Sequence, residues 1–565
     1  MHELLKYPSY VGENDEVAPI AVDFWTNWVS TLEDEFFGYE EDKKPPWTES
    51  AKTNTLLAVS ELWNKIRFPP PEITNGWDSE AKKTFKIFRA DVRDLIQGAY
   101  EQLLDDMLDQ FTLLTLGALG RGQWLELEAG LFCLNALAEG LEPEADQRLK
   151  SLFSFSLFSQ MSEGPSIPAA TRRTAVDMVG FFTGFFLRNV EFLPPVLTFL
   201  FSALAQPSLA NSAAKSFASL CSQCRKSLTG ELDSFFQMYQ QFLQYPTADV
   251  LTKSKVLEGI TSIVEALTSE EKKHGRIQQL LNVVAQDADK AILLAKDGHA
   301  AEEGVVSALA ALQCLTSMGK ALQAPDEAVI DLEADKSPST YWTQGPGAAI
   351  QKQIITLIEY LTKVYETDSD IIEEACSIFR TGYKETVPGP FVLPPTETVD
   401  FISRCTLNTP RLPFVLETAC IFLTSHKNDK SSSFHEQAQH LLHHVLKLMQ
   451  QLGHPSVDPD VSVGCIEVVQ RIINTNAGIL KNEPPEVLQG MFNFSVECVK
   501  CPDVLPKRAA SQLWVRVSTS HFLISSPKLL TFVFRMISLL SLLIRVIRNE
   551  LLRRTLSITL LPPSP

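Results

Sequence analysis

Two pairs of cysteines have the three-residue spacing that metal and redox sites use. Cys221 and Cys224 lie in the stretch AAKSFASLCSQCRKSL, and Cys498 and Cys501 form a second pair 277 residues further along the chain. Four thiolates could hold a zinc ion, and a single pair that follows a strand could act as a redox dithiol. Either chemistry depends on the structural elements around the pairs.

The first cysteine pair fits the apolar stripe of a helix. The residues on that stripe are Ala213, Ala214, Phe217, Leu220, Cys221 and Cys224. A free cysteine in such a stripe behaves as a small hydrophobic residue. No strand pattern precedes the pair, and distant repeats of an elongated array do not meet. We therefore predict buried structural thiols, with no metal and no cofactor.

Three histidines in the stretch HEQAQHLLHHVLKLMQQL could also bind a metal. His440 and His444 are four residues apart and could face one ion, with His443 between them. However, the glutamate of the His-Glu-x-x-His motif is absent, and the segment has its own leucine and valine stripe. We predict solvated or capping histidines. Phosphate-binding loops, nucleophile elbows and kinase motifs are also absent from the sequence, so we predict that the protein is not an enzyme and has no catalytic residue.

Composition and charge narrow the possible partners. The chain has 565 residues, of which 45% are hydrophobic, and a formal net charge of −18. A surface of this sign repels phosphates, which argues against direct nucleic-acid binding and favours a basic protein partner. Scattered cysteines and a start without a signal-peptide pattern predict an intracellular protein in a reducing compartment.

The periodicity of the apolar residues is helical along most of the chain. In TRRTAVDMVGFFTGFF, for example, Val176, Val179, Phe182 and Phe186 recur at three- and four-residue steps. Proline, glycine and polar clusters separate stretches of normal helix length, and strand-like alternation is hard to find. The sequence therefore predicts an all-α chain of short antiparallel helices.

One class of these helices recurs with a small or apolar anchor residue. The anchors are Ala129, Ala175, Ala213, Leu257, Ala308, Ala375, Ala419, Cys465 and Ala509. Most neighbouring anchors are 38 to 46 residues apart, with longer gaps of 51 and 67 residues. Two-helix HEAT or armadillo units have a similar length, so we predict an α-solenoid, or superhelix, over residues 1–514. The longest gap contains a predicted acidic loop insertion at 323–347.

The composition changes after residue 514. Residues 515–565 contain seven basic residues and one acidic residue, Glu550, and they are rich in Leu, Ile and Ser. A tail anchor at 529–544 is one interpretation. That segment is shorter than the roughly 20 residues needed to span a bilayer, and it contains Arg535. We therefore expect no membrane insertion, and we interpret 515–565 as a non-native or disordered tail.

Three consecutive stretches resemble a known family. They are LEAGLFCLNALAEGLE, then TRRTAVDMVGFFTGFFLRNVEFLPPVLTFLFSAL, then SLANSAAKSFASLCSQCRKSLTGELDSFFQMYQQFL. In this order they look like the middle of a karyopherin-β nuclear transport receptor of the importin thirteen and transportin-SR branch. The cysteine-containing helix Ala213 to Arg225 matches a helix of that branch. The likeness extends over about residues 17 to 514 in helical layout, with its sharpest motifs between 125 and 245.

This resemblance implies a transport function. A karyopherin-β is expected to carry protein cargo between cytoplasm and nucleus, to bind Phe-Gly repeat nucleoporins in grooves between helices, and to be controlled by the Ran GTPase. The start of the chain resembles an interior repeat, so we expect the family's Ran-binding N-terminal repeats to be missing and the chain to be incomplete at both ends. A HEAT or armadillo scaffold outside transport is the alternative function.

Acidic clusters are the candidate sites for basic cargo. The first comprises Glu33, Asp34, Glu35, Glu40, Glu41 and Asp42, and the second, within the acidic loop, comprises Asp326, Glu327, Asp331, Glu333 and Asp335. Opposite charge would speed encounter with a basic partner and help to select it.

Overall fold

The computed structural model describes residues 2–36, 45–162, 166–297, 301–323, 340–384, 388–429 and 431–519. The regular structure in these ranges is helical, and no strand occurs among the described residues. The prediction of an all-α chain is confirmed. The described helices were also searched for membrane spans, and none of them combines the length and apolar character that a bilayer crossing requires.

The helices fall into two compact units, Met1–Ser269 and Glu270–Pro565. The α-helices of the first unit are α1 (His2–Leu5), α2 (Val17–Phe36), α3 (Thr48–Lys65), α4 (Pro71–Thr74), α5 (Ser79–Arg121), α6 (Trp124–Leu137), α7 (Asp146–Leu149), α8 (Phe155–Ser162), α9 (Ala169–Phe181), α10 (Thr183–Arg188), α11 (Leu193–Leu204), α12 (Ala210–Gln223), α13 (Leu232–Phe242) and α14 (Val250–Glu265).

The second unit continues with further helices. They are α15 (Glu270–Asp297), α16 (Ala301–Ala321), α17 (Ala348–Val364), α18 (Ser369–Thr381), α19 (Pro395–Arg404), α20 (Leu412–Ser425), α21 (Ser432–Leu452), α22 (Pro459–Asn476), α23 (Gly478–Asn482), α24 (Pro485–Lys500) and α25 (Val504–Thr519). Several of the described helices start at an Asp or Ser cap that accepts a backbone N–H, for example Asp249 at α14 and Asp458 at α22.

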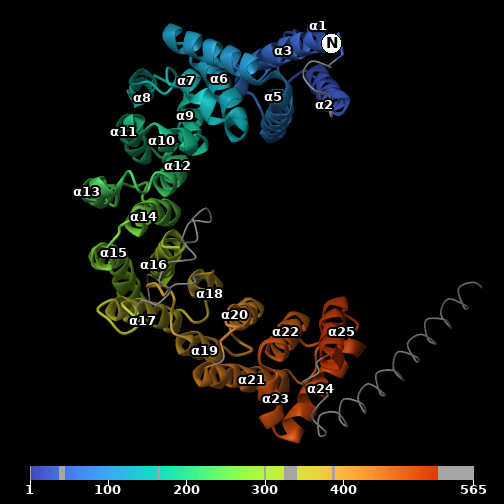
Figure 1. Ribbon diagram of the computed structural model, residues 1–565, viewed down its shortest axis with the longest axis vertical. Coiled ribbons are helices and arrows are strands. Elements are labelled where there is room, and N and C mark those ends of the chain that lie inside the picture. Colours follow the sequence, from blue (N-terminus) through green and yellow to red (C-terminus); the bar gives the residue numbers. More distant parts are fainter. Residues whose placement is uncertain are drawn as a thin grey trace, which may run out of the picture. The chain divides into compact units, whose positions relative to one another are not determined.

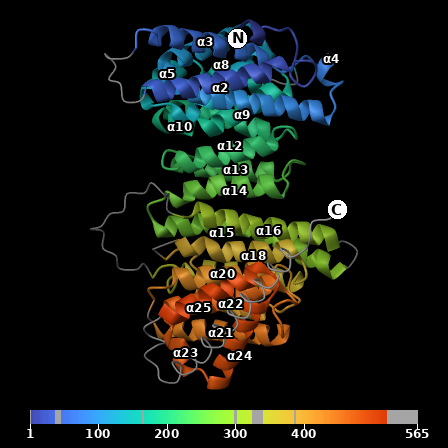
Figure 2. The ribbon, with the colours of Figure 1, turned by 90° about the vertical axis from the view of Figure 1, so that its right-hand side faces the viewer.

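Each unit has two layers of helices. In the first unit, α6, α9, α12 and α14 contact one another in chain order, while α8 and α11 contact each other on the other side (Figure 1). In the second unit, the first row consists of α16, α18, α20, α22 and α25. The other row consists of α15, α17, α19, α21 and α24. Figure 2 shows the helices of each unit stacked one above another. We call the first row of each unit its close-packed layer and the other row its second layer.

The predicted anchors all lie in the close-packed layers. Ala129, Ala175, Ala213 and Leu257 belong to α6, α9, α12 and α14, and the remaining five belong to α16, α18, α20, α22 and α25. Each anchor is at most 4% exposed. One helix of each layer therefore makes one repeat, as in α11 with α12 or α21 with α22, and the prediction of an α-solenoid of HEAT-like helix pairs is confirmed.

Two sequence features extend beyond the described residues. Helix α25 continues across position 514 to Thr519, and the rest of the predicted tail, including 529–544, lies outside the described residues. Residues 324–339 of the predicted acidic loop also lie outside them. At the described end of that loop, Trp342 is buried, stacks on His274 of α15, and donates its indole N–H to Glu270 Oε2 at 2.6 Å.

Glycines set the spacing of the close-packed layers. A Cβ atom on Gly180 of α9 would lie 2.9 Å from Ser216 Oγ on α12, and one on Gly259 of α14 would lie 2.8 Å from the Phe217 ring. In the second unit, a Cβ on Gly464 of α22 would lie 2.9 Å from Leu416 of α20. These contacts are too short for any larger residue, so neighbouring helices approach each other closely only because of the glycines.

Buried polar contacts also connect successive repeats. In the first unit, Arg89 of α5 donates to both carboxylate oxygens of Glu128 on α6, at 2.7 and 2.9 Å, and Thr174 Oγ1 of α9 donates to Glu128 Oε1 at 2.8 Å. The Arg89 and Glu128 side chains are 8% and 1% exposed. Because removal of either partner would leave a buried charge unpaired, this contact fixes the register of three helices.

A similar contact joins α18 and α20 in the second unit. Arg380 donates to Thr418 Oγ1 at 2.8 and 2.9 Å and to Glu417 Oε2 at 3.0 Å. Its guanidinium also lies 3.8 Å from the centroid of the Phe414 ring. The planar guanidinium can satisfy several acceptors and a ring face at once, which suits arginine to this position.

The cysteines belong to the core. All ten are free and buried, and Cys221 and Cys224 are both fully inaccessible. Burial raises the pKa of Cys224 to about 12 and raises that of Cys221 well above its usual value. The prediction of buried structural thiols is confirmed. A search of the described residues found no group of three or more His, Cys, Asp or Glu side chains able to hold a metal ion.

One of the three histidines of α21, His444, differs from the prediction. His440 is exposed, as expected, but His443 Nε2 lies 2.9 Å from Glu483 Oε1, and Glu483 is almost fully buried. His444 is partly buried, and this burial lowers its pKa to about 4. The expectation of solvated or capping histidines therefore holds for His440 and for His443, whose side chain is 52% exposed beside Glu483, and was wrong for His444, which the packing around α21 partly covers.

The glycine spacing yields a stability test. We expect Gly259→Ala to lower the thermal unfolding midpoint of the full chain, because overpacking costs about 1–3 kcal/mol. The matched control is Gly120→Ala in α5, where a Cβ would have no neighbour within 4 Å. In this control variant, the higher helix propensity of alanine should raise the free energy of unfolding by about 0.5–1 kcal/mol. Circular dichroism melting curves provide the measurement, and equal midpoints for the two variants would contradict this account.

The buried thiols yield a reactivity test. With a pKa of about 12 for Cys224, only about one thiol in ten thousand would be a thiolate at pH 8, and reagents alkylate the thiolate. We expect iodoacetamide to leave Cys221 and Cys224 unmodified in the folded chain at pH 8 and to alkylate both in denaturant, as read by peptide mass spectrometry. Rapid modification of either cysteine in the folded chain would show that this stripe is accessible.

Candidate partner-binding grooves

The acidic candidates are only partly described by the structure. Glu33, Asp34 and Glu35 lie in the last turns of α2, and all three are exposed. The other members of the first cluster, Glu40, Glu41 and Asp42, lie outside the described residues, as do Asp326, Glu327, Asp331, Glu333 and Asp335. The described part of the first cluster is thus a short carboxylate surface at one helix end.

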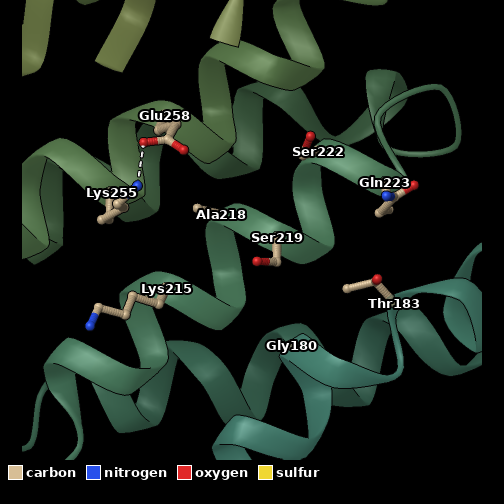
Figure 3. A pocket seen from close by; sticks show the side chains of 9 residues that line it. All are labelled: Gly180, Thr183, Lys215, Ala218, Ser219, Ser222, Gln223, Lys255 and Glu258. Carbon is tan, nitrogen blue, oxygen red and sulfur yellow. Dashed lines mark hydrogen bonds and ion pairs between the residues drawn. The ribbon is translucent and has the colours of Figure 1, made fainter. Parts of the chain in front are cut away.

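A polar groove lies over α12 in the first unit (Figure 3). It has a volume of about 540 Å³. Gly180 of α9 and Thr183 of α10 form one wall, and Lys255 and Glu258 of α14 form the other. The residues that α12 contributes are Lys215, Ala218, Ser219, Ser222 and Gln223. We call this the polar groove.

The residues of the polar groove are arranged by charge. Figure 3 shows Lys215, Lys255 and Glu258 at one end, and Thr183, Ser222 and Gln223 at the other. Lys255 Nζ donates to Glu258 Oε2 at 2.8 Å, one helical turn along α14. The groove therefore has a cationic end and a neutral end rich in hydroxyl and amide groups.

Asp177 of α9 lies next to the cationic end. Burial raises the pKa of this carboxyl group, while a hydrogen bond with Ser212 and the charges of Arg173 and Lys215 oppose the rise. Asp177 is half-buried, and Ser212 and Lys215 of α12 both favour its charged form.

An apolar groove lies between α21 and α24 in the second layer of the second unit. It has a volume of about 620 Å³. Leu446, Met449, Val487, Met491 and Phe494 provide its apolar lining, and the rim is polar. The rim residues are His443, Lys447, Gln450, Asn493, Glu486 and Glu497, with Gly453 and Gly490 also at the edge. We call this the apolar groove.

Glycine opens the apolar groove. A Cβ on Gly490 of α24 would have no neighbour within 4 Å, so the space above this residue is empty. Met449 and Met491 are nearly buried at the base, whereas Leu446 and Val487 are partly exposed on facing helices. Methionine adapts its shape easily, so this lining can accommodate an inserted apolar or aromatic side chain.

The sequence pattern did not single out either groove. On α12, the spacing of Lys215, Ser219 and Gln223 at four-residue steps marks the face opposite the cysteine stripe, and this signal was available. The opposing residues, such as Lys255 and Gly180, come from repeats about 40 residues away in sequence, and only the packing of the helices brings them to the same groove.

Comparison with known proteins supports the family resemblance. Residues 161–238 match the family model described as the Transportin-3/Importin-13 third TPR domain. The matched segment lies within the region of the sharpest motifs and contains all of α12, which forms the base of the polar groove.

Two curated relatives extend this match. The chain is 23% identical to the importin beta-like protein kap111 of Schizosaccharomyces pombe over 537 residues, which is 92% of this chain and 52% of kap111. It is 21% identical to human importin-13 over 386 residues, which is 67% of this chain and 38% of that protein. The chain thus spans about half or less of the length of these relatives.

A solved structure shares the fold. The structure titled "Importin13 cytosolic state" matches 94% of this chain and 58% of its own length, with a TM-score of 0.76 and 16% sequence identity. The structural likeness shows the same solenoid of helix pairs. The matched repeat region, the sequence relatives and the shared solenoid fold together make this chain similar to importin-13-like proteins of the karyopherin-β family.

Proposed function

We propose that this chain acts in nuclear transport as a receptor that binds protein cargo and Phe-Gly repeat nucleoporins and moves between cytoplasm and nucleus. The observation that carries the proposal is the apolar groove between α21 and α24, in a chain whose relatives are importins. No bond-making chemistry is assigned to the chain. Control by the Ran GTPase is part of the proposal at the level of the family, and we assign no residue to it.

The shape and lining of the apolar groove suit a phenylalanine side chain. Leu446 and Val487 would contact the two faces of an inserted ring, and Met449 and Met491 would form the base. Such a contact buries a small apolar area, so one Phe-Gly dipeptide binds weakly. Several such dipeptides on the same polypeptide raise the overall affinity.

Basic cargo is the second part of the proposal. The net charge of −18 favours positively charged partners. Glu33, Asp34 and Glu35 are exposed carboxylates at the end of α2, where they could meet such a partner. Exposed charges of this kind mainly increase the association rate and the selectivity, and the affinity they provide decreases with added salt.

The nucleoporin contact can be tested by filling the apolar groove. We expect the wild-type chain to be retained on an immobilised Phe-Gly repeat polypeptide and Gly490→Phe to reduce retention about fivefold, as expected for the loss of one contact worth about 1 kcal/mol. The control is Gly275→Phe in α15, at an exposed glycine of the same unit that also has open space above it.

Two outcomes would count against this part of the proposal. An equal loss of retention for Gly490→Phe and Gly275→Phe would show that the apolar groove does not bind the Phe-Gly repeats. Absence of retention of the wild-type chain, beside a karyopherin-β that is retained, would favour the alternative of a HEAT-repeat scaffold outside transport, because such a scaffold has the same fold without affinity for Phe-Gly repeats.

The cargo contact can be tested by charge reversal. We expect the triple variant Glu33→Lys, Asp34→Lys and Glu35→Lys to slow the association of a lysine-rich peptide at low salt, measured by stopped-flow fluorescence. A second triple variant, Glu13→Lys, Glu72→Lys and Glu101→Lys, changes the net charge equally at exposed positions elsewhere in the first unit. Equal slowing in both variants would mean that only the total charge matters and that the end of α2 is not a cargo site.

A further inference from the structure

The polar groove is hollow because its three helices meet through small residues. Gly180 of α9 packs on Ser216, and Gly259 of α14 packs on Phe217 and Ala218. These contacts hold α9 and α14 close to α12, and Ala218 presents only a methyl group at the centre of the groove. The longer side chains therefore stand at the ends of the groove and leave its middle open.

The cationic end stands out in an acidic protein. Lys215 is exposed, and Lys255 is partly exposed, with 33% of its side chain accessible. Lys255 is paired with Glu258 on its own helix, and the acidic neighbour of Lys215 is Asp177, which is half-buried. An incoming carboxylate can thus approach Lys215 directly and can compete with Glu258 for Lys255.

The neutral end offers hydrogen bonds in both directions. The hydroxyl groups of Thr183 and Ser219 can donate and accept, and the amide of Gln223 has both functions as well. Ser222 Oγ already accepts from Arg225 Nη2 at 3.0 Å, which leaves its own O–H free to donate. An extended peptide backbone presents alternating donors and acceptors of the kind that these groups bind.

From this arrangement we propose that the polar groove binds an extended acidic segment of a partner protein. A glutamate or aspartate of that segment contacts Lys215 and Lys255, and the following backbone lies across Ser219 toward Thr183, Ser222 and Gln223. This site is opposite in charge to a surface for basic cargo. The proposal depends only on the polar groove, so it is independent of whether the chain carries cargo to the nucleus.

The net charge of the chain makes such a site selective. A chain with a charge of −18 repels acidic peptides over most of its surface, so binding requires the local field of Lys215 and Lys255. Glu258 adds to this selectivity, because an incoming carboxylate must displace it from Lys255. Binding should weaken with added salt, as expected for exposed ion pairs.

The experiment measures binding of a fluorescent peptide of eight alternating glutamate and serine residues to the full chain by anisotropy. We expect Lys215→Glu to weaken binding about fivefold and Glu258→Gln to strengthen it by about twofold to threefold, because the latter variant frees Lys255 from its partner. The control Lys226→Glu reverses an exposed lysine that follows α12 and does not line the groove, and it should leave the affinity nearly unchanged.

Four results would overturn the proposal. The first is that the acidic peptide does not bind the wild-type chain, and the second is that a matched peptide of glycine and serine binds equally well. The third is that Lys226→Glu weakens binding of the acidic peptide as much as Lys215→Glu does. The fourth is that Glu258→Gln binds the acidic peptide more weakly than the wild-type chain does. Circular dichroism of each variant checks that the helices remain folded. Because Glu258→Gln is expected to increase affinity, a general loss of structure cannot imitate the predicted pattern.

Discussion

The close approach of successive helices in one layer is the constraint on which the rest of this structure depends. Gly180, Gly259 and Gly464 sit where a Cβ atom would collide with the next helix, and the buried anchors Ala175, Ala213 and Ala419 lie in the same layers. Small residues at these positions therefore allow the helices of one layer to pack closely against each other.

Polar side chains in the close-packed layers follow the same repeat as the glycines. Glu128 connects α5, α6 and α9, and Arg380 connects α18 to α20. Each of these charged groups meets a hydroxyl group or an opposite charge on the next repeat. An apolar stripe alone would allow helices to slide by a turn, whereas a buried charge that loses its partner costs several kcal/mol, roughly 3–5. The repeats are thus fixed in register as well as held together.

The two grooves follow from this packing, one in the close-packed layer of the first unit and the other in the second layer of the second unit. In the close-packed layer, small residues at the helix contacts leave a shallow polar hollow with lysines at one end. In the second layer of the second unit, Gly490 and the methionines leave an apolar slot between α21 and α24. The same helical repeat can therefore form surfaces of different chemistry.

The sequence alone determined the secondary structure class, the repeat of helix pairs and the burial of the cysteines. The anchor spacing located helices α6, α9, α12 and α14, and the stripe through Ala213, Phe217 and Cys221 correctly predicted buried thiols. These properties are local, because they follow from which side chains share one face of one helix. Three consecutive stretches that include α12 also resembled the karyopherin-β family.

Only the tertiary structure decided which residues of different repeats meet. Glu483 reaches His443 across 40 residues of sequence, and Lys255 and Gly180 join Lys215 from neighbouring repeats. Helical periodicity defines a face, but it does not define the rotation and offset between two helices, and a shift of one turn would place other residues opposite one another. The glycine contacts and the buried charges set that offset, so the grooves could not be read from the sequence, although the helices that form them could.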